Sequence, residues 1–492
     1  MPDIILVIDQ GTTGTTVVLF DSQFRVVSRG YQEFRQIYPA PGWVEHDPDD
    51  IWRSVLASLD IALKKSSSNP SDIKAIGITN QRETTVVWNR QTGKPYYNAI
   101  VWQCCRSADI CEKLKDKGNE DVFWGKTGLF LDPYFSGTKL TWYFRNVPNL
   151  REEALEGKVA AGTVDTFLVW KLSGGKTYVT DVTNASRTLL MDIKSLSWDE
   201  DLCDILEVPV KILPEIKGST EVFGHTLNMP GIPDGIPICG IAGDQQAALF
   251  GQACFQPGEA KCTYGTGSFL LMNTGNEPVF SNNKLLTTVA WKLKDETTYA
   301  LEGSTFIAGA AVQWLRDGLN IIENAADIEE LAKQVSDTGG VTMVPAFVGL
   351  GAPHWRPDAR GLITGLTRGT NRAHLARAVL EGIALQNVEI LYAMESDSKQ
   401  KLSALKVDGG ASENNLLMQM QADLLRCRII RPEMVEATAL GAAFFAGIGA
   451  GIIKNTGEIT GMRNEYYSFE PEIDDDERKA VLERWRIAVD KA

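Results

Sequence analysis

Residues 6–16 read LVIDQGTTGTT, an apolar run that ends in one carboxylate, two glycines and four threonines. The apolar run predicts a buried β-strand, and TTVVLFD after the turn predicts a second strand beside it. Glycine leaves backbone N–H groups uncovered and threonine adds hydroxyl donors, so this turn can surround phosphate oxygens. Taken alone, Gly-Thr-Thr-Gly is more typical of an ordinary hairpin turn, and Asp9 decides between the two interpretations.

Asp9 stands two residues before this turn, where its carboxylate would repel a phosphate group. A cation between the two would remove that repulsion. Mg²⁺, which binds oxygen ligands and keeps part of its water, is the natural mediator. The sequence therefore predicts a phosphate-binding turn with a magnesium site at Asp9.

The overall composition limits the classes of partner. The chain has 492 residues, 44% of them hydrophobic, which predicts two large domains or three. A net charge of −14 without any run of Lys or Arg argues against nucleic acid and against an anionic membrane surface. Small polar substrates or proteins remain as partners.

Several segments bear on location and metal chemistry. The N-terminal MPDIILVID lacks the charged flank and long apolar region of a secretory signal, so we expect a cytoplasmic protein. Residues 437–453 carry no charge, but their Ala and Gly content predicts a tightly packed interior helix and no integral membrane segment. Eight cysteines without a CxxC pair and four scattered histidines predict reduced thiols and no zinc or disulfide framework.

The first half of the chain begins with three short strands, IILVID, TTVVLFD and RVVSRGYQEF, whose close spacing predicts an antiparallel meander. DPDDIWRSVLASLDIALKK then places apolar residues four apart behind a capping Asp, which predicts an amphipathic helix. IKAIGITN follows as a short, nearly all-apolar strand. The pattern indicates a mixed α/β sheet.

The second half repeats this order. KCTYGTGSFLLMNT, residues 261–274, again gives strand, Gly/Thr turn and strand, about half a chain away from the first turn. Helices are expected at 304–319 and 373–395, followed by the strand ALKVDGG and by Ser412 as the N-cap of the helix ENNLLMQMQADLL. This predicts a duplicated domain, with the boundary near residue 250 and domains at 1–250 and 251–492.

Two further glycine turns fit a nucleotide. Thr266 lies in the second Gly-Thr-Gly turn, which could close on the same phosphates as the first. Gly409 and Gly410 precede a helix N-terminus, an edge that favours anions. None of the three turns is a Walker A loop or a dinucleotide fingerprint. Together they predict a nucleotide held between two domains.

Arg82 and Glu83 follow directly after a buried strand, in ITNQRETTVVW. A guanidinium and a carboxylate side by side could grip neighbouring hydroxyl groups. An exposed ion pair at a strand end is an equally good interpretation of these two residues alone.

The aromatic residues Trp102, Tyr134 and Phe269 could form an apolar wall for the carbon atoms of a substrate, although each alone is more typical of a core.

Asp244 follows a small apolar strand in GIAGDQQAALFG. A carboxylate there could take the proton from an attacking hydroxyl in phosphoryl transfer. Alternatively, Asp244 could be the N-cap of the helix QQAALFG. Sequence leaves both open.

These motifs together resemble the FGGY carbohydrate kinases, over nearly the whole chain. The matching stretches, in order, are IDQGTT, PGWVEHDP, GITNQRETT, NAIVWQCCR, DPYFSGTK, TVDTFLVWKL, TNASRT, GIAGDQQAALFGQ, TYGTGSF, ALEGS, VPAFVGLGAPHW, RGLITGLTRGT, VDGGASENN and TALGAA. PYFSGTK and GLITGLTRGTNRAHLARAVLE resemble the two family signatures. QRETT, DPYFSGTK and GDQQAALFGQ resemble the branch that phosphorylates glycerol.

The resemblance implies two duplicated actin-like ATPase domains of the ribonuclease H-like, sugar-kinase and heat-shock type, closing over ATP, Mg²⁺ and a polyol. It implies that glycerol is phosphorylated by ATP at one primary hydroxyl, as the first step of glycerol catabolism, with Asp244 as the base. Relatives form homodimers and homotetramers, which the resemblance extends to this chain. The implied glycerol contacts are Arg82, Glu83, Trp102, Tyr134, Asp244, Gln245 and Phe269. The implied nucleotide contacts are Thr12, Thr13, Gly14, Thr16, Thr266, Gly309, Gln313, Gly410 and Asn414, with Asp9 holding Mg²⁺.

Two departures from the family pattern matter. Many bacterial relatives have serines and an arginine just after the first turn, where this chain has Gly14, Thr15 and Thr16. The loop that binds fructose 1,6-bisphosphate in enterobacterial relatives here reads NMPGIPDGIPICG, with Gly235 in place of the arginine. We therefore expect that feedback site to be absent.

Two alternatives remain at this stage. One is a kinase of the same family that acts on another polyol or a pentulose. The other is a non-catalytic, nucleotide-switched protein like actin, which would need the phosphate turns but no base and no grip on a hydroxyl.

Overall fold

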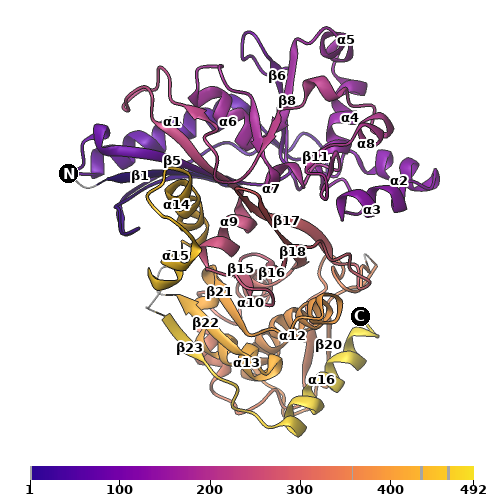
Figure 1. Cartoon of the computed structure of the whole chain (residues 1–492). Coiled ribbons are helices and arrows are strands. Elements are labelled where there is room, and N and C mark those ends of the chain that lie inside the picture. The colour runs from indigo at the N-terminus through magenta and orange to yellow at the C-terminus, as the bar shows by residue number, and fades with distance from the viewer. Residues whose placement is uncertain (1–2, 357, 433–435, 463–465) are drawn as a thin grey trace.

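A computed structural model describes residues 3–356, 358–432, 436–462 and 466–492. Two large β-sheets, one from each half of the chain, lie one above the other, with helices α9 and α14 between them (Figure 1). The N-terminal sheet has the order β13-β14-β5-β1-β2-β3. Its strands are β1 (Ile4–Gln10), β2 (Gly14–Phe20), β3 (Val26–Glu33), β5 (Ile73–Asn80), β13 (Gly224–His225) and β14 (Pro237–Gly243).

The C-terminal sheet has the order β17-β18-β16-β15-β21-β22-β23. In both sheets a strand pairs antiparallel with the strand that follows its Gly/Thr turn and parallel with a strand on its other side. This shared pairing matches the expected duplication. The strands are β15 (Ala260–Tyr264), β16 (Ser268–Gly275), β17 (Leu286–Leu293), β18 (Glu296–Thr305), β21 (Ala404–Asp408), β22 (Arg428–Pro432) and β23 (Tyr466–Phe469).

A smaller sheet of order β4-β7-β6-β8 extends the N-terminal half. It contains β4 (Glu45–His46), β6 (Thr85–Asn89), β7 (Ala99–Ile100) and β8 (Val159–Thr163). Three two-stranded pairs complete the strands: β9 (Val179–Asp181) with β12 (Glu215–Lys217), β10 (Met191–Asp192) with β11 (Ser197–Trp198), and β19 (Thr342–Val344) with β20 (Leu362–Thr364).

The helices cover the outer faces of the sheets and fill the space between them. Those of the N-terminal half are α1 (Pro48–Lys65), α2 (Ala108–Asp116), α3 (Glu120–Thr127), α4 (Ser136–Asn146), α5 (Leu150–Leu155), α6 (Val164–Leu172), α7 (Val182–Ala185), α8 (Glu200–Ile205) and α9 (Asp244–Gly251), with 3₁₀ turns at Pro70–Asp72 and Val210–Ile212. Those of the C-terminal half are α10 (Gly309–Asp317), α11 (Asp327–Ala332), α12 (Arg372–Ser398), α13 (Asn415–Leu425), α14 (Ala437–Gly449), α15 (Thr456–Met462) and α16 (Asp475–Val489), with a 3₁₀ turn at Gly410–Glu413.

Local sequence signals account for most of these elements. The side chain of Asp47 accepts a hydrogen bond from the Asp49 N–H and caps α1, as predicted. The helix expected at 304–319 begins only at residue 309, because residues up to Thr305 belong to β18. Ser412 was expected to cap α13, but this prediction is wrong: Asn414 accepts the hydrogen bond from the Leu417 N–H.

The centre of the molecule is a core shared by both halves. Helix α14 comes from the C-terminal half but packs on β1, β5 and β14 of the N-terminal sheet, and α9 packs against α14. A Cβ at Gly77 of β5 would lie only 2.5 Å from the Ala442 carbonyl oxygen, so glycine is needed for this close approach. The predicted interior helix is confirmed over Ala437–Gly449, four residues short of the expected end at 453. No helix in the described part of the chain is long and apolar enough to cross a bilayer.

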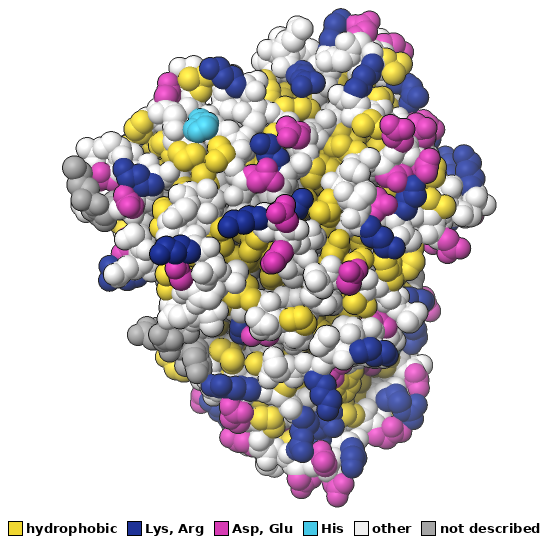
Figure 2. Space-filling view, viewed as in Figure 1, with side chains coloured by type: hydrophobic (Ala, Val, Ile, Leu, Met, Phe, Trp, Pro, Cys, Tyr) yellow, Lys and Arg dark blue, Asp and Glu magenta, His cyan; other side chains and the backbone are white. Residues whose placement is uncertain are grey.

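The surface carries both signs of charge. On the face shown in Figure 2, Lys and Arg side chains alternate with Asp and Glu, without a broad basic area. None of the eight cysteines, all of which lie in the described ranges, forms a disulfide, and among them only Cys105 is exposed.

Candidate active site

The first Gly/Thr turn lies at the edge of the N-terminal sheet where β1 ends. The Gly11 N–H donates a hydrogen bond to the Gly14 carbonyl oxygen at 3.0 Å, which closes the turn. Thr12 is half-buried and Thr13 is exposed. Thr16 pairs with Asp9 across the ladder, which puts the two side chains on the same face.

The Asp9 carboxylate lies in an electrostatically unfavourable place. Burial and the nearby charges of Asp244 and Glu436 raise its pKa from 3.8 to about 7, against the opposing charge of Arg29. Glu436 forms an ion pair with Arg29, yet its Oε2 is buried and has no hydrogen-bond partner within the described ranges. A divalent cation beside Asp9 would relieve this repulsion.

The donor set fits magnesium bound partly through water. Among the described residues, no group of three or more His, Cys, Asp or Glu side chains is arranged to hold a metal by itself. Mg²⁺ at kinase sites is usually held by one or two carboxylates together with phosphate oxygens and water. Asp9 alone would supply that kind of incomplete protein shell.

Arg82 and Glu83 form a tight turn directly after β5. Their side chains are both 2% exposed, so the interpretation as an exposed ion pair at a strand end is wrong. Glu83 adopts a left-handed backbone with φ = 59°, which is unusual for this residue type and points to a functional constraint. Its carbonyl oxygen accepts hydrogen bonds from the Ser136 and Thr85 hydroxyls, both at 3.0 Å.

Asp244 is the first residue of α9, and Gly243 occupies the N-cap position. The alternative interpretation of Asp244 as the N-cap is therefore wrong. Its Oδ1 lies 3.4 Å from Arg82 Nε, and the side chain is 32% exposed, so a reactant can reach it. Burial raises the pKa of Asp244, while the charges of Arg82 and Lys261 lower it and favour the ionised form that accepts a proton.

Lys261, in β15 of the C-terminal sheet, contacts the residue next to Asp244. Its Nζ donates hydrogen bonds to Gln245 Oε1 and, at 2.9 Å, to Thr263 Oγ1. In the ladder Leu271 pairs with both Lys261 and Glu302, and Phe269 pairs with Thr263, so these side chains share one face. This face is directed at Arg82 and Gln245 of the N-terminal half.

Two of the predicted aromatic residues meet beside Arg82. The rings of Trp102 and Tyr134 lie 5.7 Å apart, edge to face. Trp102 Nε1 donates to Thr12 Oγ1 at 2.9 Å, and Arg82 Nη2 donates to the Tyr134 hydroxyl at 3.3 Å. Trp102 thereby links the first phosphate turn to the Arg82 cluster.

Three residues of the C-terminal half that were predicted to contact the nucleotide, Thr266, Gly309 and Gly410, lie near the turn between β15 and β16. Thr266 is exposed at the tip of the turn between β15 and β16, and its carbonyl oxygen accepts from the Ala308 N–H at 2.8 Å. The Gly309 N–H donates to the Gly265 carbonyl oxygen at 3.0 Å, so α10 begins against this turn. Gly409 lies against the Tyr264 backbone, which brings Gly410 to the same edge.

The positions of two predicted nucleotide contacts, Gln313 and Asn414, give weaker support for that role. Gln313 is exposed on the second turn of α10, beyond Gly309. The side-chain Oδ1 of Asn414 accepts a hydrogen bond from the Leu417 N–H and caps α13, which leaves the side-chain N–H₂ to contact a ligand.

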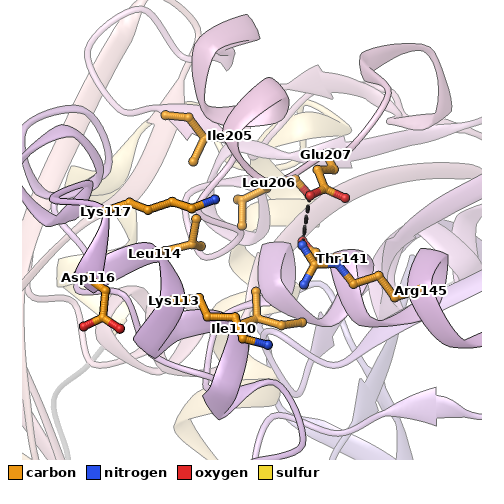
Figure 3. A pocket seen from close by; sticks show the side chains of 10 residues that line it. All are labelled: Ile110, Lys113, Leu114, Asp116, Lys117, Thr141, Arg145, Ile205, Leu206 and Glu207. Atoms are coloured by element: carbon orange, nitrogen blue, oxygen red, sulfur yellow. Dashed lines mark hydrogen bonds and ion pairs between the residues drawn. The ribbon is translucent and has the colours of Figure 1, made fainter.

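A separate hollow lies on the outer side of the N-terminal half (Figure 3). It has a volume of about 310 Å³ and is bordered by α2, α4 and the end of α8. Arg145 and Glu207 form an ion pair of 2.9 Å at its margin. It includes none of the predicted site residues.

Sequence reasoning missed three charged residues of the site: Lys261, Arg187 and Glu302. The signal that could have found Arg187 and Glu302 is a lone charge inside the otherwise small or apolar stretches TNASRT and ALEGS. Both stretches belong to the family motifs quoted above, which assign no role to either charge.

Comparison with known proteins places the chain in a family. Residues 4–251 match the N-terminal domain of the FGGY family of carbohydrate kinases, and residues 260–450 match its C-terminal domain. The chain belongs to the FGGY family of carbohydrate kinases. The predicted fold of two duplicated actin-like α/β domains is thereby confirmed.

Individual relatives narrow the class further. The glycerol kinase of Bdellovibrio bacteriovorus is 55% identical over 492 residues, which cover 100% of this chain and 99% of the relative. The crystal structure of Plasmodium falciparum glycerol kinase with ADP is similar at a TM-score of 0.94, with 40% identity over 99% of this chain and 98% of that one. A ligand-bound xylulose kinase from Lactobacillus acidophilus shares the fold, with a TM-score of 0.89 and 23% identity over 99% of this chain and 97% of that one.

Proposed function

We propose that this chain transfers the γ-phosphoryl group of ATP to a primary hydroxyl of glycerol, which gives sn-glycerol 3-phosphate and ADP. One observation carries the proposal: Arg82, Glu83, Tyr134 and Asp244 form a single cluster at the junction of the two sheets, with Arg82 Nε 3.4 Å from Asp244 Oδ1. Full-length similarity to glycerol kinases supports glycerol as the acceptor.

Arg82 and Glu83 would hold the hydroxyl groups that do not react. A guanidinium donates and a carboxylate accepts, so the pair recognises two vicinal hydroxyls. Tyr134 and Gln245 add polar contacts, and Trp102 and Phe269 cover the carbon atoms. Binding all three carbons at fixed points presents one terminal hydroxyl to Asp244.

Asp244 would accept the proton of that hydroxyl as its oxygen attacks the γ-phosphorus. The oxygen–phosphorus bond of the acceptor forms while the bond from the γ-phosphorus to the bridging oxygen of ADP breaks, and the proton moves to the carboxylate. Burial raises the pKa of Asp244, and the positive charges of Arg82 and Lys261 oppose that rise, which favours the ionised form before the transfer. Closure of the two halves would exclude water and suppress hydrolysis of ATP.

The three glycine turns would hold ATP. Thr12, Thr13, Gly14 and Thr16 would donate to phosphate oxygens from the N-terminal half, and Thr266 from the C-terminal half. Gly309, Gln313, Gly410 and Asn414 would line the rest of the nucleotide. Mg²⁺ held at Asp9 would offset the phosphate charge when bound.

The rival function is phosphorylation of another polyol or a pentulose. The fold does not decide between them, since the xylulose kinase shares it. A non-catalytic actin-like role is disfavoured because Asp244, Arg82 and Glu83 form a cluster that a nucleotide switch does not need.

A substrate panel tests the proposal. The purified chain with ATP and Mg²⁺ is assayed for ADP release with glycerol, other polyols, xylulose and ribulose, and the glycerol product is identified with a dehydrogenase specific for sn-glycerol 3-phosphate. We expect the highest kcat/KM with glycerol. A higher kcat/KM with a pentulose, or ADP release independent of any acceptor, would refute the proposal.

Assembly and location complete the proposal. We propose domains at residues 1–250 and 251–492, a homodimer or homotetramer, and a place in the cytoplasm as the entry step of glycerol catabolism. Light scattering of the purified chain tests the oligomer, and cell fractionation tests the location.

A further inference from the structure

Two stretches of the sequence each send one charged side chain into the interior. Arg187, in TNASRT, follows α7 and is fully buried; Glu302, in ALEGS, lies in β18 and is 2% exposed. Burying a charge is costly unless it is paired. The partners of these two residues therefore indicate what they do.

Both side chains contact the pair proposed to grip the alcohol. Arg82 donates two hydrogen bonds to Glu302, from Nη1 to Oε2 at 2.6 Å and from Nη2 to Oε1 at 3.0 Å. Arg187 donates from Nε to Glu83 Oε1 at 2.7 Å and from Nη2 to Glu302 Oε1 at 2.9 Å. Two positive and two negative side chains therefore form one network without net charge. Glu302 holds Arg82, and Arg187 holds Glu83.

Arg187 also touches the aromatic side of the site. Its guanidinium carbon lies 5.8 Å from the centre of the Tyr134 ring and 5.3 Å from that of Phe135. Its Nη1 is buried and lacks a hydrogen-bond partner in the described part of the chain. A buried N–H left unpaired is costly, so the position of this guanidinium is set by its other contacts.

Glu302 connects the two halves. Arg82 and Glu83 belong to the turn after β5 in the N-terminal half, whereas β18 belongs to the sheet that carries the Thr266 turn. Ser268 pairs with Thr305 and Leu271 pairs with Glu302 in the same ladder, so Glu302 lies on the strand that braces this turn. A continuous set of contacts therefore runs from Arg82 through Glu302 and β18 to the Thr266 turn.

We propose that Arg187 and Glu302 are positioning residues of the alcohol site: Arg187 fixes the Glu83 carboxylate, and Glu302 fixes the Arg82 guanidinium and couples it to the C-terminal sheet. This inference rests on the proposed alcohol-binding role of Arg82 and Glu83. Neither residue needs to touch the substrate.

The electrostatics agree with this assignment. Burial would raise the pKa of Glu302, but the charges of Arg187 and Arg82 lower it to about 2, so it stays ionised. Burial raises the pKa of Glu83, and Arg82 and Arg187 oppose that rise. The charged and titratable groups that face Glu83 are Arg82, Arg187, Glu302, Tyr134 and Lys139.

A double-mutant cycle on the full-length enzyme tests Arg187. Arg187→Lys keeps the charge but lacks the planar fork whose Nε and Nη2 donate to Glu83 and Glu302. We therefore expect kcat/KM for glycerol to fall on the order of tenfold to a hundredfold, with KM for ATP within about twofold. In a Glu83→Gln background, Arg187→Lys should lower log(kcat/KM) for glycerol by less than about a third of the decrease that it causes in the unmodified chain. The reason is that Arg187 acts through Glu83. Arg145→Lys, which alters the surface pair with Glu207, is the matched control and should change neither constant.

A pH profile separates positioning from simple loss of packing. Because Arg187 opposes the rise in the pKa of Glu83, Arg187→Met should weaken glycerol binding further at low pH, moving the acidic limb of kcat/KM for glycerol to higher pH. If Arg187 variants do not fold, Glu302→Gln is measured in the same cycle with Arg82→Lys, where the two effects should again be strongly non-additive.

The outcomes are distinct. Additive effects in both cycles, or equal losses for glycerol and ATP, would overturn the positioning role. Failure of the unmodified chain to phosphorylate glycerol would instead refute the proposed function, and that measurement is made first.

Discussion

Asp9 should make the ligand-free protein less stable as the pH rises. Its pKa is about 7 in the folded chain against an ordinary value of 3.8, because Asp9 is partly buried and lies near the charges of Asp244 and Glu436. Between about pH 4 and 7 the unfolded chain has released this proton while the folded chain retains it, so the free energy of unfolding falls as the pH rises. Below pH 4 the effect vanishes, and above pH 7 it is complete.

The size of the effect follows from the shift. One pKa unit corresponds to about 1.4 kcal/mol, so the shift from 3.8 to about 7 amounts to about 4 kcal/mol above pH 7. Asp9→Asn has nearly the same shape but never ionises, and removes this cost. With an unfolding entropy typical of a chain of 492 residues, 4 kcal/mol corresponds to roughly 4 °C in Tm.

The assay is thermal unfolding of both proteins without nucleotide and with a chelator, from pH 5 to 8.5. The Tm of Asp9→Asn should exceed that of the unmodified chain by an amount that grows up to pH 7 and is constant above it. Asp295→Asn, at an exposed position between β17 and β18, is the control and should show no trend. A difference in Tm that is independent of pH, or a less stable Asp9→Asn at pH 8, would refute the reasoning.

Three further predictions concern binding and packing. Arg82→Lys cannot donate to Glu302 as a fork, so kcat/KM for glycerol in the coupled assay should fall on the order of 10² with KM for ATP nearly unchanged. Thr266→Ala removes an exposed turn hydroxyl and should raise KM for ATP about tenfold without lowering Tm, and an unchanged KM would remove Thr266 from the nucleotide site. Phe250→Ala deletes a fully buried ring stacked 4.0 Å from Phe445, so urea unfolding should show a loss of about 3–5 kcal/mol; a loss below 1 kcal/mol would contradict the shared core.

Sequence alone predicted the parts of the fold that local signals govern. The apolar run before Asp9, the capped amphipathic helix after Asp47 and the buried strand IKAIGITN all form as expected. Where two caps competed within three residues, at Ser412 and Asn414, the sequence gives no basis for choosing, and the choice of Ser412 was wrong. The start of α10 was misplaced because the end of β18 has a composition that either element tolerates.

The residues of the site could be predicted from the sequence, but most of the contacts between them could not. Arg82, Glu83 and Asp244 stand at strand ends, where sequence can identify them as candidates. That Arg82 is held by Glu302, 220 residues further along the chain, depends on how two sheets meet, and a single sequence carries no record of that contact. Burial of Arg82 and Glu83 distinguishes a substrate-binding pair from a surface ion pair. It could not be predicted from the sequence for the same reason.

The most direct test of the account is a single-turnover measurement on Asp244→Asn, with labelled ATP and saturating glycerol. If Asp244 accepts the proton of the attacking hydroxyl, the rate of phosphoryl transfer should fall on the order of 10² to 10⁴, while the Kd for ATP stays within about threefold. Transfer at a near-normal rate, or an equally large loss of ATP binding, would contradict the account.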